Sequence, residues 1–153
     1  MLVRIKELWM KALRSGEYTQ GDGQLMCGTD EKPEYCCLGV LCELHRKEHH
    51  DKVWEHTRYL NRHAYLPPEV AEWAGLCEDV LVDKGKDDID GGYDLRLGGC
   101  DTAATLNDEN HSFESIADKI ETHVRPHQYQ SNYASRKAKE QISYHQNTSH
   151  VTP

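Results

Sequence analysis

The chain has 153 residues, a length that suits one domain able to bury its own core. No apolar run approaches the roughly 20 residues of a membrane-spanning helix and the mean hydropathy is −0.81, so we expect no contact with a membrane. The formal net charge is −8, and residues 66–121 carry four basic and fifteen acidic side chains. Because general affinity for nucleic acids comes from Lys and Arg, this acidic segment excludes bulk nucleic-acid binding but permits a local pocket with one or two arginines.

Apolar residues recur as far as Val124 and then become rare. After Pro126 the chain is rich in Gln, Ser, Asn, His and Thr, a composition that cannot bury a core. We therefore predict a globular domain over residues 1–125 and a polar, flexible tail over residues 126–153. The start of the chain lacks the apolar core of an export signal, so we expect the six cysteines to be reduced thiols packed as small apolar side chains.

The first predicted element is a helix over residues 3–15, because its apolar residues follow the spacing of one helical face and a glycine ends it. Residues 24–27 and 34–37 flank a polar stretch, which predicts a short β-hairpin. A second helix follows to about residue 49. It contains Gly39, which lowers helix propensity and often permits close packing.

The second half of the chain predicts three further helices. A short helix begins at Pro68 and ends at Gly75, since Pro suits the first helical turn and Gly suits a left-handed cap. Thr102 and Ser112 are the predicted N-caps of the last two helices. The final helix presents an apolar face as far as Val124.

Between the third and fourth helices we predict a strand at residues 80–82 and a loop rich in Gly and Asp at residues 83–99. Residues 51–64 are polar and carry no clear pattern. Together the elements predict a compact α+β single domain, with four or five short helices around a small β-hairpin or sheet. The predicted core comprises Leu8, Trp9, Leu13, Leu38, Leu41, Val70, Trp73, Leu106, Phe113, Ile116 and Ile120.

Three cysteines close together in the sequence raise a metal or thiol interpretation. Cys36 and Cys37 are adjacent, the wrong spacing for a zinc ribbon, although Cys42 and His45 would share a helix face and could supply half a site. Cys37 lies near the start of a predicted helix, a position that can favour nucleophilic catalysis. We favour apolar packing over both alternatives, and we assign no catalytic residue, no metal ligand and no cofactor.

Two further motifs lack required parts. An EF-hand alignment of the acidic loop places Lys86 and Leu97 where calcium ligands are needed, so we reject that interpretation. The helix capped by Ser112 is similar to the first helix of a helix-turn-helix, but no recognition helix with basic or amide side chains follows it. A helix-turn-helix DNA-binding regulator therefore ranks third among our hypotheses.

The candidate ligand site lies in the polar loop after the first helix. Its glycines would let backbone amides approach a ligand, while Arg14 could pair with a phosphate or carboxylate and Tyr18 could stack on a ring. The predicted ligand-binding residues are Arg14, Tyr18, Gln20, Asn107 and Asp108. The competing interpretation is structural: Arg14 would cap carbonyls of the first helix, and Asn107 and Asp108 would act as caps.

Five blocks follow one another in order along most of residues 5–121. They are ELW at 7–9, ALRSGEY at 12–18, CCLGVLC at 36–42, LPPEVAEWAGL at 66–76 and LNDE at 106–109. In these blocks the chain resembles an uncharacterised family of small bacteriophage and prophage accessory proteins. The resemblance implies a phage protein acting in the cytoplasm of a bacterial host, where such proteins alter host physiology or blunt host defences.

From this context we predict a non-enzymatic binding protein that counters a host defence. It would sequester a small nucleotide-like signal or inhibit a host defence protein. The alternative is a small metal- or thiol-dependent enzyme. We expect no bulk nucleic acid and no membrane as partner, and a homo-oligomer remains open.

Overall fold

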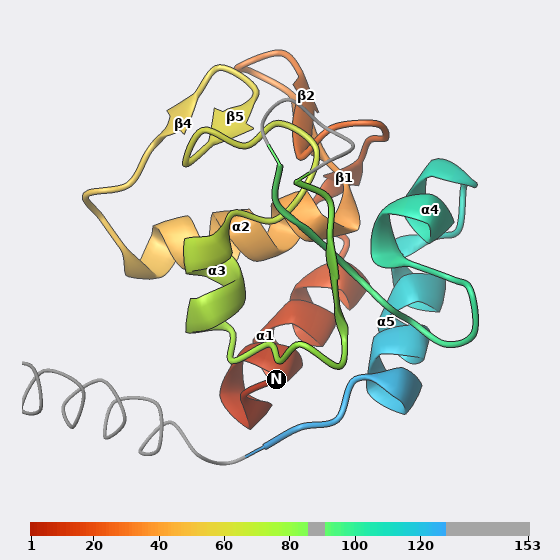
Figure 1. The fold of residues 1–153 in the computed structure, drawn as a ribbon. Coiled ribbons are helices and arrows are strands. Elements are labelled where there is room, and N and C mark those ends of the chain that lie inside the picture. Colours follow the sequence, from red (N-terminus) through yellow and green to blue (C-terminus); the bar gives the residue numbers. More distant parts are fainter. Residues whose placement is uncertain (86–90, 128–153) are drawn as a thin grey trace, which may run out of the picture.

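The computed structural model describes residues 1–85 and 91–127. This part of the chain forms five helices and three small β-sheets (Figure 1), which confirms the predicted α+β class. The helices are α1 (Val3–Arg14), α2 (Cys37–Glu48), α3 (Pro68–Trp73), α4 (Ala103–Asp108) and α5 (Phe113–His123). The strands are β1 (Thr19–Gln20), β2 (Met26–Gly28), β3 (Pro33–Tyr35), β4 (Trp54–Glu55), β5 (Arg58–Tyr59), β6 (Leu81–Asp83) and β7 (Tyr93–Leu95). The predicted polar tail lies outside the described residues from residue 128 onward.

α1 is the amphipathic helix that the apolar spacing predicted. Ile5, Trp9 and Leu13 are buried where α1 packs against α2 and α5, whereas Leu8, which we expected in the core, is only partly buried. The indole Nε1 of Trp9 donates a hydrogen bond of 2.9 Å to the carbonyl oxygen of Cys37. This bond satisfies the buried indole and ties α1 to the start of α2.

α2 lies in the middle of the molecule and contacts α1, α3 and α4 (Figure 1). Gly39, in its first turn, lies against the backbone of Leu25. A Cβ atom at Gly39 would be 1.7 Å from the carbonyl oxygen of Leu25, a distance no side chain can occupy. The close packing inferred from this glycine is therefore confirmed.

The predicted helix caps are present. Thr102 accepts a hydrogen bond from the backbone N–H of Thr105, and Ser112 accepts one from that of Ser115. Gly75, just after α3, has the left-handed φ of 68° expected of a C-terminal glycine. Trp73, expected in the core, is only partly buried, and its ring packs edge-on against His45 and His49.

The two ends of the described chain meet. Lys6 of α1 is buried and donates hydrogen bonds of 3.1 and 2.6 Å to the carbonyl oxygens of Glu121 and Val124, so a cation satisfies the C-terminal end of α5. Leu2 forms an isolated parallel bridge with His127. α1 and α5 pack against each other, and these bonds also join them at one end.

The largest sheet has the order β1-β3-β2 and contains the predicted hairpin. β2 and β3 pair antiparallel, with Cys27 opposite Glu34, and β1 adds a parallel partner that the sequence did not indicate. β4 and β5 form a second hairpin within the segment that carried no clear pattern.

The third sheet corrects one prediction. The strand expected at residues 80–82 is present as β6, but the loop predicted over residues 83–99 contains β7, which pairs with β6. Asp94 and Leu95 of β7 are buried, and β7 also contacts α4, so tertiary packing overrides a composition rich in Gly and Asp. None of the helices within residues 1–85 and 91–127 combines the length and apolar character needed to cross a bilayer.

Candidate functional site

Arg14, the first of the predicted ligand-binding residues, joins α1 to α5. Its guanidinium forms ion pairs with Asp118 and Glu121, with N–O distances of 2.7 and 2.9 Å. The hydrogen bond to Asp118, followed by that to Glu121, raises the pKa of Arg14 above its ordinary value. The structural interpretation had Arg14 cap carbonyls of its own helix. Instead, two carboxylates of α5 hold its side chain.

Tyr18 lies over β3 and α2. Its ring packs edge-on against Tyr35, with centroids 5.7 Å apart. Its hydroxyl oxygen accepts a hydrogen bond of 2.8 Å from Nζ of Lys47. Tyr18 thus faces different elements from Arg14, which faces α5.

Gln20, Asn107 and Asp108 are brought together by the fold. Oδ1 of the buried Asn107 accepts hydrogen bonds from Nε2 of Gln20 at 3.0 Å and from the backbone N–H of Cys37 at 3.1 Å. Asp108 accepts a bond of 2.9 Å from the backbone N–H of Gly23. These bonds join the loop after β1 to α4. A ligand-binding role for the three residues stays a prediction.

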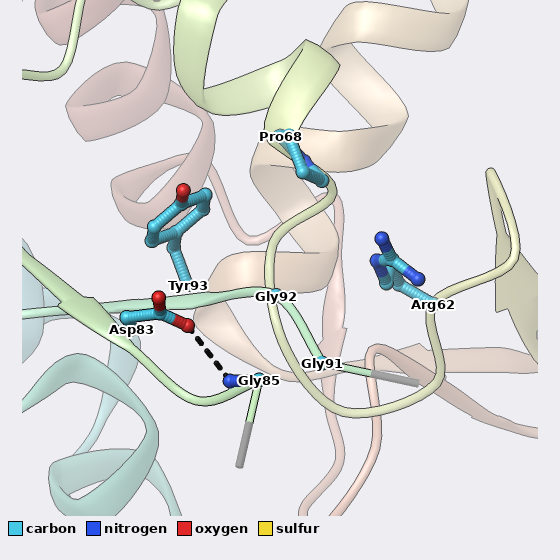
Figure 2. Close-up of a pocket in the computed structure, with 7 residues that line it drawn as sticks. All are labelled: Arg62, Pro68, Asp83, Gly85, Gly91, Gly92 and Tyr93. Carbon is cyan, nitrogen blue, oxygen red and sulfur yellow. Dashed lines mark hydrogen bonds between the residues drawn. The ribbon is translucent and has the colours of Figure 1, made fainter. Parts of the chain in front are cut away.

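A pocket of about 300 Å³ lies elsewhere in the chain (Figure 2). It forms between the turn after β5, the start of α3 and the β6–β7 pair, and its volume is at the lower end of the range of small-molecule sites. Figure 2 shows Asp83 and Arg62 on opposite sides, with the Tyr93 ring beside Asp83. The lining residues are Arg62, Pro68, Asp83, Gly85, Gly91, Gly92 and Tyr93.

A tight turn positions Arg62. The backbone N–H and C=O groups of Tyr59 and Arg62 bond each other at 2.9 and 3.0 Å, and the two residues between them, Leu60 and Asn61, have φ values of 49° and 66°. Two successive positive φ values are typical of a type I′ turn, which Asn tolerates and Leu disfavours. The pairing on both sides of the turn holds Leu60 in this disfavoured conformation.

A buried hydrogen bond anchors the same turn to α2. The hydroxyl of Tyr59 is bonded to Nδ1 of His45, and both side chains are buried. The His45 ring stacks on His49, with centroids 3.9 Å apart. Burial, with a smaller contribution from His49, lowers the pKa of His45 to about 4, so His45 is neutral near pH 7. The turn that carries Arg62 therefore has a rigid support.

The Arg62 guanidinium has no ion pair within the described residues. Its Nε atom is buried and finds no hydrogen-bond partner among them. Arg4, Arg14 and Arg46, by contrast, hold carboxylates. The Arg62 guanidinium is therefore a cation at the pocket that no carboxylate among the described residues neutralises.

Three glycines, Gly85, Gly91 and Gly92, also line the pocket. Gly92 has a φ of 116°, and a Cβ atom there would lie 2.8 Å from the carbonyl oxygen of Leu66, so only glycine fits. Oδ1 of Asp83 accepts a hydrogen bond of 2.8 Å from the backbone N–H of Gly85. This bond orients the Asp83 carboxylate at the edge of the pocket.

Comparison with known proteins gives a family. A family model described as a domain of unknown function, DUF8296, matches residues 1–124. The chain belongs to the DUF8296 family. No curated protein matches the chain, nor does any solved structure. Every residue that lines the pocket lies inside the matched segment, so the candidate site is part of the DUF8296 domain.

None of the residues predicted to bind a ligand lines the pocket of this DUF8296 domain. Arg62 falls in the segment without a pattern, and Asp83 and Tyr93 fall in the predicted loop. Two signals were available: Asn61, a residue type that tolerates a positive φ, and the Gly91–Gly92 pair before Tyr93. Neither signal shows that the two segments meet, because their proximity depends on tertiary packing.

The six cysteines of the DUF8296 domain differ in burial, and Cys27 is partly buried. Cys36, Cys37 and Cys42 are buried as predicted, and burial raises the pKa of Cys37 well above its ordinary value. Cys77 and Cys100 are exposed, so the prediction that all six cysteines pack inside is wrong for these two, which lie in connections between elements. Within residues 1–85 and 91–127, no group of three or more His, Cys, Asp or Glu side chains is placed to hold a metal ion.

Proposed function

We propose that the chain is a non-enzymatic binding protein that holds one small, anionic, ring-containing molecule of the nucleotide type in the Arg62 pocket. The observation that carries the proposal is the Arg62 guanidinium, which lines the pocket and has no ion pair among the described residues. A guanidinium offers a planar fork of donors that matches a phosphate or carboxylate. The Tyr93 ring offers a surface for a flat ligand.

Size and charge favour a single small ligand over a nucleic acid. The pocket has a volume of about 300 Å³ and contributes one guanidinium, whereas residues 66–121, which supply the rest of its lining, are strongly negative overall. The exposed side of α5 carries Glu114, Asp118 and Glu121, which would repel a phosphate backbone. These features count against the DNA-binding regulator.

The resemblance to phage proteins supports a biological role for such binding. In this proposal the protein is a phage accessory factor in the bacterial cytoplasm that sequesters a nucleotide-like signal of a host defence. Inhibition of a host protein has less support, because Val53 is the one large hydrophobic side chain that is exposed among the described residues. A thiol enzyme also has less support, since burial keeps the Cys37 thiol protonated.

Isothermal titration calorimetry with a panel of nucleoside monophosphates tests the proposal. Arg62→Gln removes the cation, and we expect it to weaken binding by about tenfold or more, because a hydrogen bond to a charged group is lost. Arg14→Gln is the matched control, and it should bind like the original protein because Asp118 and Glu121 already hold Arg14. Unchanged affinity in Arg62→Gln would contradict the proposal. If only Arg14→Gln lost affinity for the nucleotides, the ligand site would instead be the loop after α1.

A further inference from the structure

The pocket contains a fixed carboxylate in addition to its cation. Asp83 is the last residue of β6, and the backbone N–H of Gly85 donates to its Oδ1 at 2.8 Å. This bond leaves Oδ2 and the second lone pair of Oδ1 as acceptors. Figure 2 shows the carboxylate and the Arg62 guanidinium on opposite sides of the pocket. No ion pair joins either residue to another described residue.

The sheet register places an aromatic ring next to this carboxylate. Asp83 of β6 is directly opposite Tyr93 of β7, and side chains of opposite residues in an antiparallel pair lie on the same face. A flat ligand that packs on the Tyr93 ring therefore presents one edge to Asp83. Its anionic group can then extend toward Arg62 on the other side.

From this juxtaposition we infer that the pocket selects a nucleotide whose base presents adjacent N–H donors, as guanine does. The inference rests on the proposed nucleotide binding. An ionised carboxylate accepts hydrogen bonds but donates none. The Watson–Crick edge of guanine presents N1–H and the exocyclic amino group, both donors, and matches Asp83. Adenine presents a ring nitrogen acceptor at the corresponding position, which would face the carboxylate without a hydrogen bond.

The same chemistry predicts a switch of specificity. In Asp83→Asn, the amide oxygen can still accept from Gly85, and the amide NH₂ replaces Oδ2 as the group that faces the ligand. Xanthine carries a carbonyl oxygen where guanine carries the amino group, so the amide of Asn matches xanthine. Asp83→Asn should therefore prefer xanthosine monophosphate to guanosine monophosphate.

Calorimetric titration of the full chain with the guanosine, adenosine and xanthosine monophosphates tests this inference. We expect the original protein to bind GMP at least about tenfold more tightly than AMP, and Asp83→Asn to reverse the order of GMP and XMP. Asp118→Asn, at the ion pair with Arg14, is the matched control and should keep the original order. Thermal melting of each variant verifies that it is folded.

The outcomes separate this inference from the proposed function. Equal affinity for GMP and AMP in the original protein, or an unchanged order of GMP and XMP in Asp83→Asn, overturns the inference that Asp83 selects the base. The proposed function still stands in that case if Arg62→Gln weakens the binding of all three nucleotides. If the original protein binds none of the three, both the proposed function and the inference fail. Binding of free amino acids instead would show that Arg62 and Asp83 hold a carboxylate and an ammonium group, and would overturn the inference.

Discussion

Asn107, near the end of α4, accepts a hydrogen bond from the backbone N–H of Cys37, the first residue of α2, at 3.1 Å. The same side chain also bonds Gln20 and a carbonyl oxygen of the loop after β1. One buried amide therefore connects three segments that are distant in the sequence.

We expect Asn107→Ala to lower the free energy of unfolding by about 2–3 kcal/mol, because it leaves several buried groups without partners. Asp108→Ala, the adjacent control, removes one exposed bond to Gly23 and should cost about 1 kcal/mol or less. Urea denaturation of both variants measures the difference. Equal losses would mean that the Asn107 bonds contribute little to stability.

Gly39→Ala should be among the most destabilising substitutions in the chain. The added Cβ would lie 1.7 Å from the carbonyl oxygen of Leu25, and backbone on both sides must shift to relieve the clash. We expect a loss of about 3 kcal/mol or more, measured by thermal or urea unfolding. Gly16→Asn is the control, because nothing lies within 4 Å of a Cβ there and Asn tolerates its positive φ.

Thiol labelling should follow burial. With iodoacetamide on the native protein, Cys77 and Cys100 should react first, because both are exposed. Cys36, Cys37 and Cys42 should be protected, since burial removes access and raises the pKa of Cys36 to about 12. Mass spectrometry of peptides assigns each adduct, and labelling in urea should reach all six cysteines. Fast native labelling of Cys37 would revive the thiol-enzyme hypothesis.

Acid should destabilise the protein through His45. Its pKa is about 4 in the folded state and about 6.5 when unfolded, so between these values the unfolded state binds more protons. The contribution of His45 to the free energy of unfolding is fully present above pH 6.5. It decreases as the pH drops toward 4 and does not decrease further below that pH. The loss over this pH range should be about 3 kcal/mol.

His45→Gln should flatten this part of the pH dependence, because no ionisable group remains at the position. Urea unfolding at pH 7 and pH 4.5 measures the slope separately from any uniform loss caused by breaking the bond to Tyr59. His50→Gln, at an exposed histidine just after α2, is the control and should keep the original slope. An unchanged slope in His45→Gln would assign the acid sensitivity to other groups.

Local chemistry in the sequence predicted the helices well. Thr102, Ser112 and Gly75 act through bonds or dihedral angles within a few residues, so their roles are visible in the sequence. β7 was missed because it pairs with β6 and buries Leu95, and neither contact is visible in a local sequence rich in Gly and Asp.

The candidate site was less predictable than the fold. The polar loop after α1 was a reasonable place for a ligand, but Gln20 finds its partner Asn107 at a separation of 87 residues, which no local pattern shows. Arg62 and Asp83 line opposite sides of one pocket, and no local pattern shows this either. Their segments are brought together by the I′ turn, by α3 and by the register of a sheet whose second strand was not expected.

The closure of α5 onto α1 bears on how the protein is made. Lys6 bonds the carbonyl oxygen of Val124 across 118 positions, and the amino group of Met1 bonds that of Arg125 across 124. During translation, the face of α1 that packs on α5 stays uncovered until nearly the whole domain has left the ribosome. Contacts this distant in sequence slow folding, so the nascent chain must keep its first amphipathic helix from aggregating while its last one is still being synthesised.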